Sequence, residues 1–267
     1  MRRTIAKVLL VTVALVGCGS STSTGTSASS SATSATSSSA PAVTGGLTVF
    51  AAASLTESFT DAKTALEAAN KGLTITYSFA GSDSLVTQIQ NAAPADVIAT
   101  ASVGTMKALS DAGLVETVQT FARNKLEILV QPGNPKGIKT IADLARTGIT
   151  FVTEEDTVPA GKYTAQMLQT AGITVNPVSK ETDVKSAVSR VTSGEADATV
   201  VYVTDVLAAG SKGFGVEIPD AQNVIASYPI AIVKGATHHA AAAAFIAAIL
   251  STDGQANLAK HGFLAAK

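Results

Sequence analysis

The chain has 267 residues, with 19 lysines and arginines against 20 aspartates and glutamates, and 46% of its residues are hydrophobic. This length allows one large domain or two small ones, and the hydrophobic content supports a sizeable core, which excludes global disorder. A net charge of −1 excludes the basic surface of a nucleic-acid-binding protein, and a single cysteine excludes an intrachain disulfide framework and a cysteine-rich zinc site.

The first 17 residues have the pattern of a bacterial export signal. A basic start at 1–7 precedes ten apolar residues at 8–17. A bilayer-spanning helix needs about 20 apolar residues, so this stretch is too short to remain as a membrane span. Residues 15–18 (LVGC) resemble the lipobox of bacterial lipoproteins, which implies a signal peptide at 1–17 and lipidation of Cys18. A plain secretory signal with an incidental cysteine is the alternative.

Residues 18–46 are expected to be the lipidated Cys18 followed by a disordered tether. The segment is rich in serine and threonine and has no charged or aromatic residue. It cannot bury enough apolar area to offset the entropy that ordering would cost. We therefore expect a protein anchored by its N-terminal lipid to the cell membrane, on the extracytoplasmic face, with a folded part that starts at residue 47.

Short apolar runs alternate with amphipathic ones in the first part of the folded region. Strands are expected at 47–51, 73–79 and 96–100, and helices at 54–70, 82–91 and 102–112. The first helix is expected to open with a capping box formed by Ser54 and Glu57. Strands and helices in this order predict a parallel sheet with helices on both faces.

The rest of the chain continues the alternation. Strands are expected at 125–131, 149–152, 173–178, 198–202 and 224–234, and helices at 158–172, 183–193, 240–251 and 254–261. Pro159 suits the first turn of its helix, and Asp183 is expected to cap the next one.

The long apolar runs at 125–131 and 224–234 are the natural crossings between two lobes. The sequence therefore predicts an α/β fold with lobe one at 47–125 plus 227–267 and lobe two at 126–226. In open α/β sheets, ligands bind beyond the carboxyl ends of the strands, so we expect the ligand site in the cleft between the lobes.

Three of the predicted strand-to-helix turns share one chemistry. The turns at 51–55, 79–85 and 158–161 each place small residues at the start of a helix. The first N–H groups of a helix lack partners within it, and the helix dipole adds partial positive charge there. Such an end accepts an anion without any cationic side chain. Serine is also a favoured N-cap, so each turn taken alone fits a purely structural role equally well.

Several other polar residues have simpler interpretations. Tyr202 ends an apolar strand, and one interpretation is a rim aromatic with its hydroxyl in water. The acids at 154–156 are expected in a solvated loop, because they would oppose binding if they pointed into an anion site. His238 and His239 start an alanine-rich helix and are expected on the surface.

The sequence contains none of the common catalytic or nucleotide-binding motifs: GxSxG, HExxH, a Walker A loop and GxGxxG are all absent. We therefore expect no enzymatic activity and no cofactor. An extracytoplasmic hydrolase or phosphatase is one alternative, and an adhesion lipoprotein without a ligand is another.

Six short segments carry a resemblance to a known family; they are VFAAASL at 49–55, FAGS at 79–82, APADV at 93–97, VPAG at 158–161, VY at 201–202 and YPIA at 228–231. Together they resemble the substrate-binding lipoproteins of bacterial molybdate ABC transporters, and the resemblance covers essentially all of 47–267. It implies a two-lobed type II periplasmic-binding fold, each lobe a mainly parallel sheet flanked by helices. It also implies binding of molybdate, and similarly of tungstate, as an unhydrated dianion through neutral donors.

The resemblance, carried over by position, implies five molybdate-binding residues: Ser54, Ser82, Ala160, Val184 and Tyr202. The two serines would donate hydroxyl and backbone N–H groups, the alanine and valine backbone N–H groups, and the tyrosine its phenol. Molybdenum would have no direct protein ligand. Asp83 departs from the more neutral turn that is common in the family, and we expect it to point to solvent or to cap its helix.

The resemblance also implies partners. The protein is expected to act as a monomer, to deliver the anion to the transmembrane subunit of an ABC permease, and to bind no nucleic acid. Donors without acceptors favour a fully deprotonated oxyanion, because a protonated phosphate would bury an unsatisfied O–H. Sulfate has the same charge, so a receptor for sulfate, thiosulfate or another tetrahedral oxyanion is the alternative.

Overall fold

The structure is a computed structural model that describes residues 43–267. The predicted signal peptide, the lipidation site Cys18 and nearly all of the predicted tether lie outside the described residues. Within residues 43–267, no helix is long and apolar enough to cross a membrane. The described residues form one compact unit.

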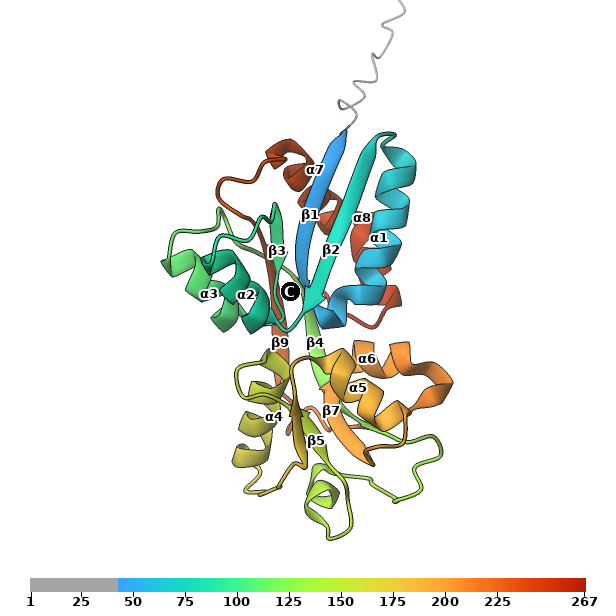
Figure 1. Cartoon of the computed structure of the whole chain (residues 1–267). Helices are drawn as coiled ribbons and strands as arrows, with labels where there is room; N and C mark the ends of the chain where they lie inside the picture. Colours follow the sequence, from blue (N-terminus) through green and yellow to red (C-terminus); the bar gives the residue numbers. More distant parts are fainter. Residues whose placement is uncertain (1–42) are drawn as a thin grey trace, which may run out of the picture. The chain divides into compact units, whose positions relative to one another are not determined.

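A mixed sheet in the order β2-β1-β3-β9-β4-β7, with β8 also paired to β4, runs through this unit (Figure 1). Its strands are β1 (Gly45–Ala52), β2 (Leu73–Ala80), β3 (Val97–Ala99), β4 (Gln119–Val130), β7 (Ala198–Tyr202), β8 (Phe214–Glu217) and β9 (Ile225–Ile232). The first three strands are parallel, whereas β9 runs antiparallel to β3 and β4 runs antiparallel to β9, β7 and β8. A separate parallel pair joins β5 (Val152–Glu154) to β6 (Ser179–Glu181).

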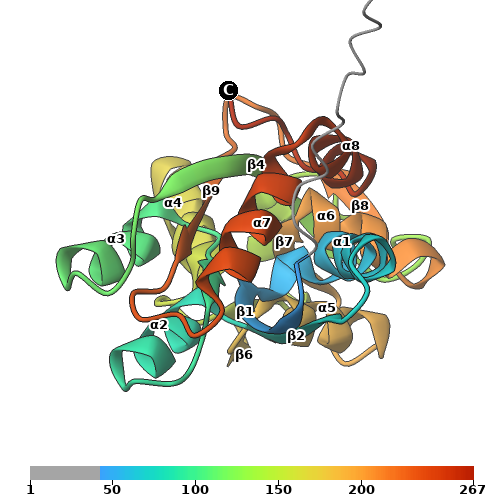
Figure 2. The same cartoon turned by 90° about the horizontal axis from the view of Figure 1, so that it is seen from above.

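Helices cover both faces of the sheet, as Figure 2 shows from above. They are α1 (Thr56–Ala69), α2 (Ser82–Gln90), α3 (Val103–Asp111), α4 (Pro159–Thr170), α5 (Val184–Thr192), α6 (Val203–Ala209), α7 (His239–Leu250) and α8 (Thr252–Lys260). The strands feed two cores because successive side chains of a strand point to opposite faces. In β1, Val49 packs into the core that contains Phe59 of α1 and Phe245 of α7, whereas Phe50 packs with Leu85 of α2 and Met106 of α3.

Strands β4 and β9 connect two groups of elements. The first part of β4 pairs with β9, and its last five residues, from Leu126 to Val130, pair with β7 and β8. We call β1–β3 with α1–α3, α7 and α8 the first lobe, and β5–β8 with α4–α6 the second lobe. The expected α/β fold is thereby confirmed, whereas the crossings at 125–131 and 224–234 stay predictions. The exact residue boundaries of the lobes stay a prediction.

Most predicted elements are present, but three strands differ in extent. The strand expected at 173–178 is wrong, because the chain there is irregular and β6 begins only at Ser179. Pro177 lies in the predicted run and has no N–H to donate to a neighbouring strand. Likewise, β5 lies at 152–154 instead of 149–152, and β4 begins at Gln119, six residues before the predicted start. The short elements β8 and α6 were not anticipated.

The predicted capping box is also wrong. A short 3-10 turn, Ala53–Leu55, intervenes, and α1 begins at Thr56 with no side-chain cap. The Ser54 hydroxyl lies 2.9 Å from the Tyr228 hydroxyl, and the Glu57 carboxylate bonds to Lys185 of the second lobe. Both side chains are therefore used by tertiary contacts that the local spacing does not reveal.

Candidate functional site

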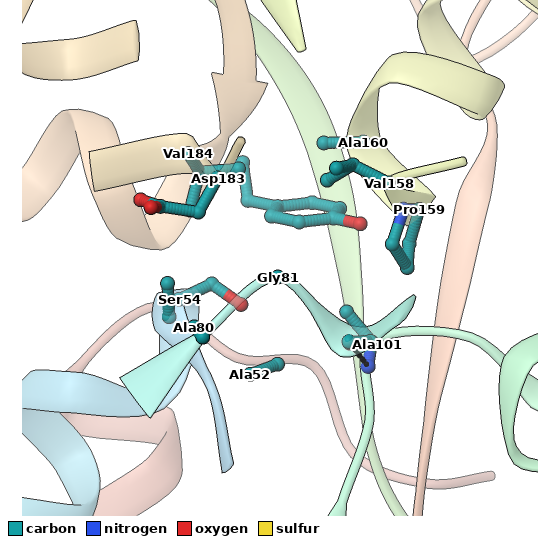
Figure 3. Close-up of a pocket in the computed structure, with 13 residues that line it drawn as sticks. Ala52, Ser54, Ala80, Gly81, Ala101, Val158, Pro159, Ala160, Asp183 and Val184 are labelled. Carbon is teal, nitrogen blue, oxygen red and sulfur yellow. Dashed lines mark hydrogen bonds between the residues drawn. The ribbon is translucent and has the colours of Figure 1, made fainter. Parts of the chain in front are cut away.

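A small pocket lies where elements of the two lobes meet (Figure 3). All five residues predicted from the sequence line it: Ser54, Ser82, Ala160, Val184 and Tyr202. The space within it that the centre of a water-sized sphere can reach is about 10 Å³. This is about the space that one bound water needs, so the pocket suits a small ion better than an organic molecule.

The pocket is bounded by the starts of three helices. Ser82 is the first residue of α2, Val184 is the first of α5, and Pro159 and Ala160 begin α4. The first N–H groups of each helix have no partner within it and carry the positive end of its dipole. In Figure 3, Ser54 and Gly81 of the first lobe face Pro159 and Val184 of the second. The structure therefore brings these turns together around one pocket, which their spacing along the sequence did not establish.

Asp183 also lines the pocket, but its carboxylate is occupied by its own helix. One oxygen accepts hydrogen bonds from the N–H groups of Lys185 and Ser186, and the other accepts from the Ser186 hydroxyl. The predicted role of Asp183 as an N-cap is confirmed. Because the cap does not use the N–H of Val184, that donor is left at the pocket.

The hydroxyl of Ser82 is held so that its hydrogen remains free. Its oxygen accepts a hydrogen bond from the N–H of Ala101, with 3.0 Å between nitrogen and oxygen. A hydroxyl that already accepts one bond still has its own hydrogen to donate. The buried Ser82 side chain is therefore a donor toward the pocket.

A chain of hydrogen bonds orients Ser54 in a similar way. The Asn124 amide nitrogen donates to Thr204 at 3.0 Å and lies 3.5 Å from the Tyr228 hydroxyl, while its oxygen accepts from the N–H of Lys125. The amide therefore presents N–H groups to Tyr228, which leaves the Tyr228 hydrogen for Ser54. Burial raises the pKa of Tyr228, so this phenol keeps its proton. The Ser54 hydrogen is then available to the pocket.

Tyr202 is not a rim residue with its hydroxyl in water, so the alternative interpretation of this residue is wrong. It is 1% exposed, and its ring contacts that of Tyr228 edge-on at 5.7 Å. Its hydroxyl is buried and has no hydrogen-bond partner within residues 43–267. Burial raises the pKa of Tyr202, so the phenol is a neutral donor. An unsatisfied buried hydroxyl costs about 1–3 kcal/mol, which a ligand at the pocket would recover.

The pocket has no cationic side chain among the described residues that line it. The nearby ammonium of Lys185 is held by Glu57 at 2.8 Å and forms an ion pair with Asp205 at 3.0 Å. No group of three histidine, cysteine or acidic side chains in the described part of the chain could hold a metal ion. The site therefore consists of neutral hydroxyl and backbone donors.

The acidic residues near the site follow the predictions only in part. Asp83 does not cap α2; it is half-buried, and its carboxylate accepts a hydrogen bond at 2.9 Å from the Thr157 hydroxyl of the second lobe. Glu155 and Asp156 are exposed, as predicted for a solvated loop. The prediction is wrong for Glu154, because this residue is fully buried at the end of β5.

Sequence reasoning missed Asn124, Tyr228 and Asp205 as supporting residues of the site. All three are fully buried polar or partly polar side chains. The one signal available for Asn124 and Tyr228 was a polar group inside an otherwise apolar strand. Nothing in the local pattern connects these positions, because β4 and β9 bring them together from distant parts of the chain.

Comparison with known proteins agrees with this geometry. Residues 47–264 match the model of a family described as bacterial extracellular solute-binding protein. The molybdate-binding protein ModA of Mycobacterium tuberculosis H37Rv is 38% identical over 218 residues, which cover 81% of this chain and 84% of that protein. ModA of Escherichia coli K12 is 33% identical over 204 residues, which cover 72% of this chain and 78% of that protein.

A solved structure confirms the fold class. The periplasmic molybdate-binding protein of Azotobacter vinelandii superimposes with a TM-score of 0.74 at 20% identity, covering 83% of this chain and 100% of that chain. The chain therefore belongs to the bacterial extracellular solute-binding proteins and, among them, to the family of the molybdate-binding proteins.

Proposed function

We propose that this protein binds molybdate, and tungstate in the same manner, outside the cytoplasm and delivers it to the transmembrane subunit of an ABC permease. The observation that carries the proposal is the pocket of neutral donors, in which the Tyr202 hydroxyl is buried without a partner among the described residues. The names of the two curated relatives support the choice of anion.

Each donor has a defined role in this proposal. Ser54 and Ser82 donate hydroxyl and backbone N–H groups, Ala160 and Val184 donate backbone N–H groups, and Tyr202 donates its phenol. The anion loses its water and keeps both charges, because fixed donors replace its hydration shell. Molybdenum is bound only through its oxygens and has no protein ligand.

Selectivity for charge follows from the absence of a free carboxylate acceptor among the described lining residues. The carboxylate of Asp183 is occupied by α5, and the Ser82 oxygen already accepts from Ala101. A protonated phosphate would therefore bury an unsatisfied O–H at a cost of about 1–3 kcal/mol. Sulfate carries the same charge as molybdate, so pocket size has to separate them. A receptor for sulfate or thiosulfate is the second candidate.

The remaining parts of the proposal concern how the protein is presented. We propose that lipidated Cys18 anchors a monomer to the extracytoplasmic face of the cell membrane. The protein uses no cofactor and catalyses no reaction, and the bound anion is its transport substrate. Closure of the lobes around the anion displays the surface that the permease recognises.

Thermal unfolding of the protein with equal concentrations of molybdate, tungstate, sulfate or phosphate tests the choice of anion. A ligand that binds the native state stabilises it by about 4 kcal/mol at 1,000 times its Kd, which corresponds to a rise on the order of 10 °C. We expect this rise with molybdate and tungstate only. A rise with sulfate alone would leave the fold assignment intact and overturn the assignment of molybdate as the substrate. No rise with any of the four anions would overturn the proposed function.

The substitution Ser82→Asp tests the site itself. It places a carboxylate against the anion, and we expect molybdate binding to be lost in isothermal titration calorimetry. Ser84→Asp is the matched control, because Ser84 lies on the same first turn of α2 but is exposed, and it should bind as the wild type does. Unchanged affinity in Ser82→Asp would remove Ser82 from the site.

A further inference from the structure

Glu154 is a buried acid for which the proposed mechanism has no use. It is the last residue of β5 and is 0% exposed. Both of its carboxyl oxygens are buried and have no hydrogen-bond partner in the described part of the chain. A carboxylate in such surroundings is strongly disfavoured, because burial removes water without supplying donors.

The backbone places Glu154 among the donors of the second lobe. In β5, Glu154 is paired in parallel with Glu181, two residues before Asp183. Phe151 of the same segment forms a parallel bridge to Ala198, at the start of the strand that ends at Tyr202. By this pairing, Glu154 is level with the end of β7. Strand β5 therefore lies between β7, which ends at Tyr202, and β6, which leads to Val184, and neighbouring strands lie about 4.8 Å apart.

The first turn of α4 closes the same region. A Cβ atom added to Gly161 would lie 2.5 Å from the Glu154 carbonyl oxygen, so the helix packs directly on the Glu154 backbone. Ala160, a proposed donor, is the neighbouring residue. Glu154 therefore lies behind the wall of the pocket, beside the turns that supply all three donors of the second lobe.

The charges around Glu154 are mostly negative. Asp205 on α6, Asp183 before α5 and Glu181 on β6 all raise its pKa, in addition to the larger effect of burial. The nearby cation, Lys185 on α5, is shared between Glu57 and Asp205. A further polar neighbour is Tyr202, whose hydroxyl is neutral. Together these effects raise the pKa of Glu154 to about 8.

We propose that the Glu154 carboxyl is a proton-binding site coupled to the anion site: the protein binds the dianion tightly only when this carboxyl is protonated. This inference rests on the proposed function. The physical reason is that an ionised Glu154 would add a buried negative charge beside the two charges of the anion. The bound anion in turn holds the proton on Glu154 more firmly, since the coupling of two ligands is reciprocal.

The sign of the pH dependence follows. The carboxyl binds a proton when the anion binds, and the proton comes from the solvent if Glu154 is ionised in the free protein. Near pH 7 the Glu154 carboxyl is already neutral, so binding of the anion takes up few protons. At about pH 9 only about one tenth of the free protein is competent, so affinity falls about tenfold and uptake approaches one proton per anion.

Isothermal titration calorimetry with sodium molybdate tests this coupling in the wild-type protein. Measurements at about pH 7 and about pH 9, in buffers of different ionisation enthalpy, give both the affinity and the number of protons taken up. Asp205, with a pKa of about 6, is ionised at both values, and the raised pKa of Tyr202 keeps its phenol protonated. The expected tenfold loss therefore reports on Glu154.

Variants assign the effect. Glu154→Gln mimics the protonated form and should bind molybdate equally well at both pH values, without the proton uptake seen in the wild type. Glu155→Gln is the matched control, because Glu155 is the exposed neighbour, and it should behave as the wild type does. If Glu154→Gln retained the full pH dependence, the assignment to Glu154 would be wrong.

The wild-type measurement stands even if a variant fails to fold. Equal affinity at both pH values with no proton uptake overturns the coupling and leaves the proposed function intact. Absence of molybdate binding at both pH values overturns the proposed function, and the coupling with it.

Discussion

At the residue scale, Tyr202 and Tyr228 show how the same side chain serves two purposes. Both are fully buried and their rings touch. The hydroxyl of Tyr228 is satisfied by Ser54 and lies beside Asn124, whereas that of Tyr202 has no partner among the described residues. The Tyr228 hydroxyl positions Ser54, which is a donor to the pocket, whereas the Tyr202 hydroxyl is itself available as a donor.

Removal of the Tyr202 hydroxyl should separate binding from stability. Tyr202→Phe keeps the ring packing and deletes only the unpartnered group, so the free protein should unfold at the same urea concentration or a higher one. Molybdate affinity should fall about 10- to 150-fold, the value of a hydrogen bond to a charged group of about 1.5–3 kcal/mol. Calorimetric titration and urea unfolding measure the two quantities.

Tyr77→Phe is the matched control and should show the opposite behaviour. The Tyr77 hydroxyl donates to the carbonyl of Phe59 at 2.8 Å, away from the pocket. Its loss should lower the free energy of unfolding by about 1 kcal/mol and leave molybdate affinity unchanged. Unaltered affinity in Tyr202→Phe would exclude the phenol as a donor.

At the element scale, α1 of the first lobe is linked to α5 of the second by an ion pair. Lys185, the second residue of α5, lies 2.8 Å from Glu57 of α1 and 3.0 Å from the fully buried Asp205 of α6. Asp205 also accepts a hydrogen bond from the N–H of Tyr202. The same lysine thus ties two elements of the site in the second lobe to the first lobe.

Breaking this link should accelerate release of the anion. Glu57→Gln leaves the pair of Lys185 with Asp205 intact and weakens only the contact between the lobes. Because the Glu57 and Lys185 side chains are 37% and 29% exposed, the effect is screened, and we expect molybdate to dissociate about two- to fivefold faster in stopped-flow measurements.

Asp61→Asn provides the comparison on the same helix. Asp61 pairs with Lys260 and His261, both within the first lobe. Its removal should not change the dissociation rate. Equal rates for Glu57→Gln and the wild type would show that the ion pair does not contribute to closure.

At the scale of the whole molecule, the buried Glu154 makes stability depend on pH even without ligand. Burial raises its pKa in the folded protein to about 8, above the ordinary value of 4.5. The folded state therefore holds this proton more tightly than the unfolded state. Stability falls as pH rises from about 4.5 to about 8 and then levels off.

Urea unfolding at about pH 6 and about pH 8.5 measures this contribution. Between these values the wild type should lose about 2–3 kcal/mol relative to Glu154→Gln, since one pKa unit corresponds to about 1.4 kcal/mol. Parallel pH profiles for the two proteins would indicate that Glu154 is not buried in its neutral form.

Much of the molecule was predictable because its signals are local. The alternation of apolar and amphipathic runs correctly identified β1, β2, α2, α4 and α5, and the start of α5 at Val184 followed from its cap, Asp183. Short elements such as β8 and α6 have too few residues for a clear period. The predicted strand at 173–178 is an error of the same kind, because its composition favours a strand that Pro177 interrupts.

Sequence by itself determined the α/β class, the helix starts that carry small residues, and, through the resemblance, the five positions that line the pocket. These properties depend on residue type and spacing along the chain. Tertiary structure alone decided that the five positions converge, that Tyr202 and Glu154 are buried, and that Ser54 bonds to Tyr228 instead of capping a helix. Burial and pairing of these groups depend on β4 and β9, which bring together residues far apart in the chain.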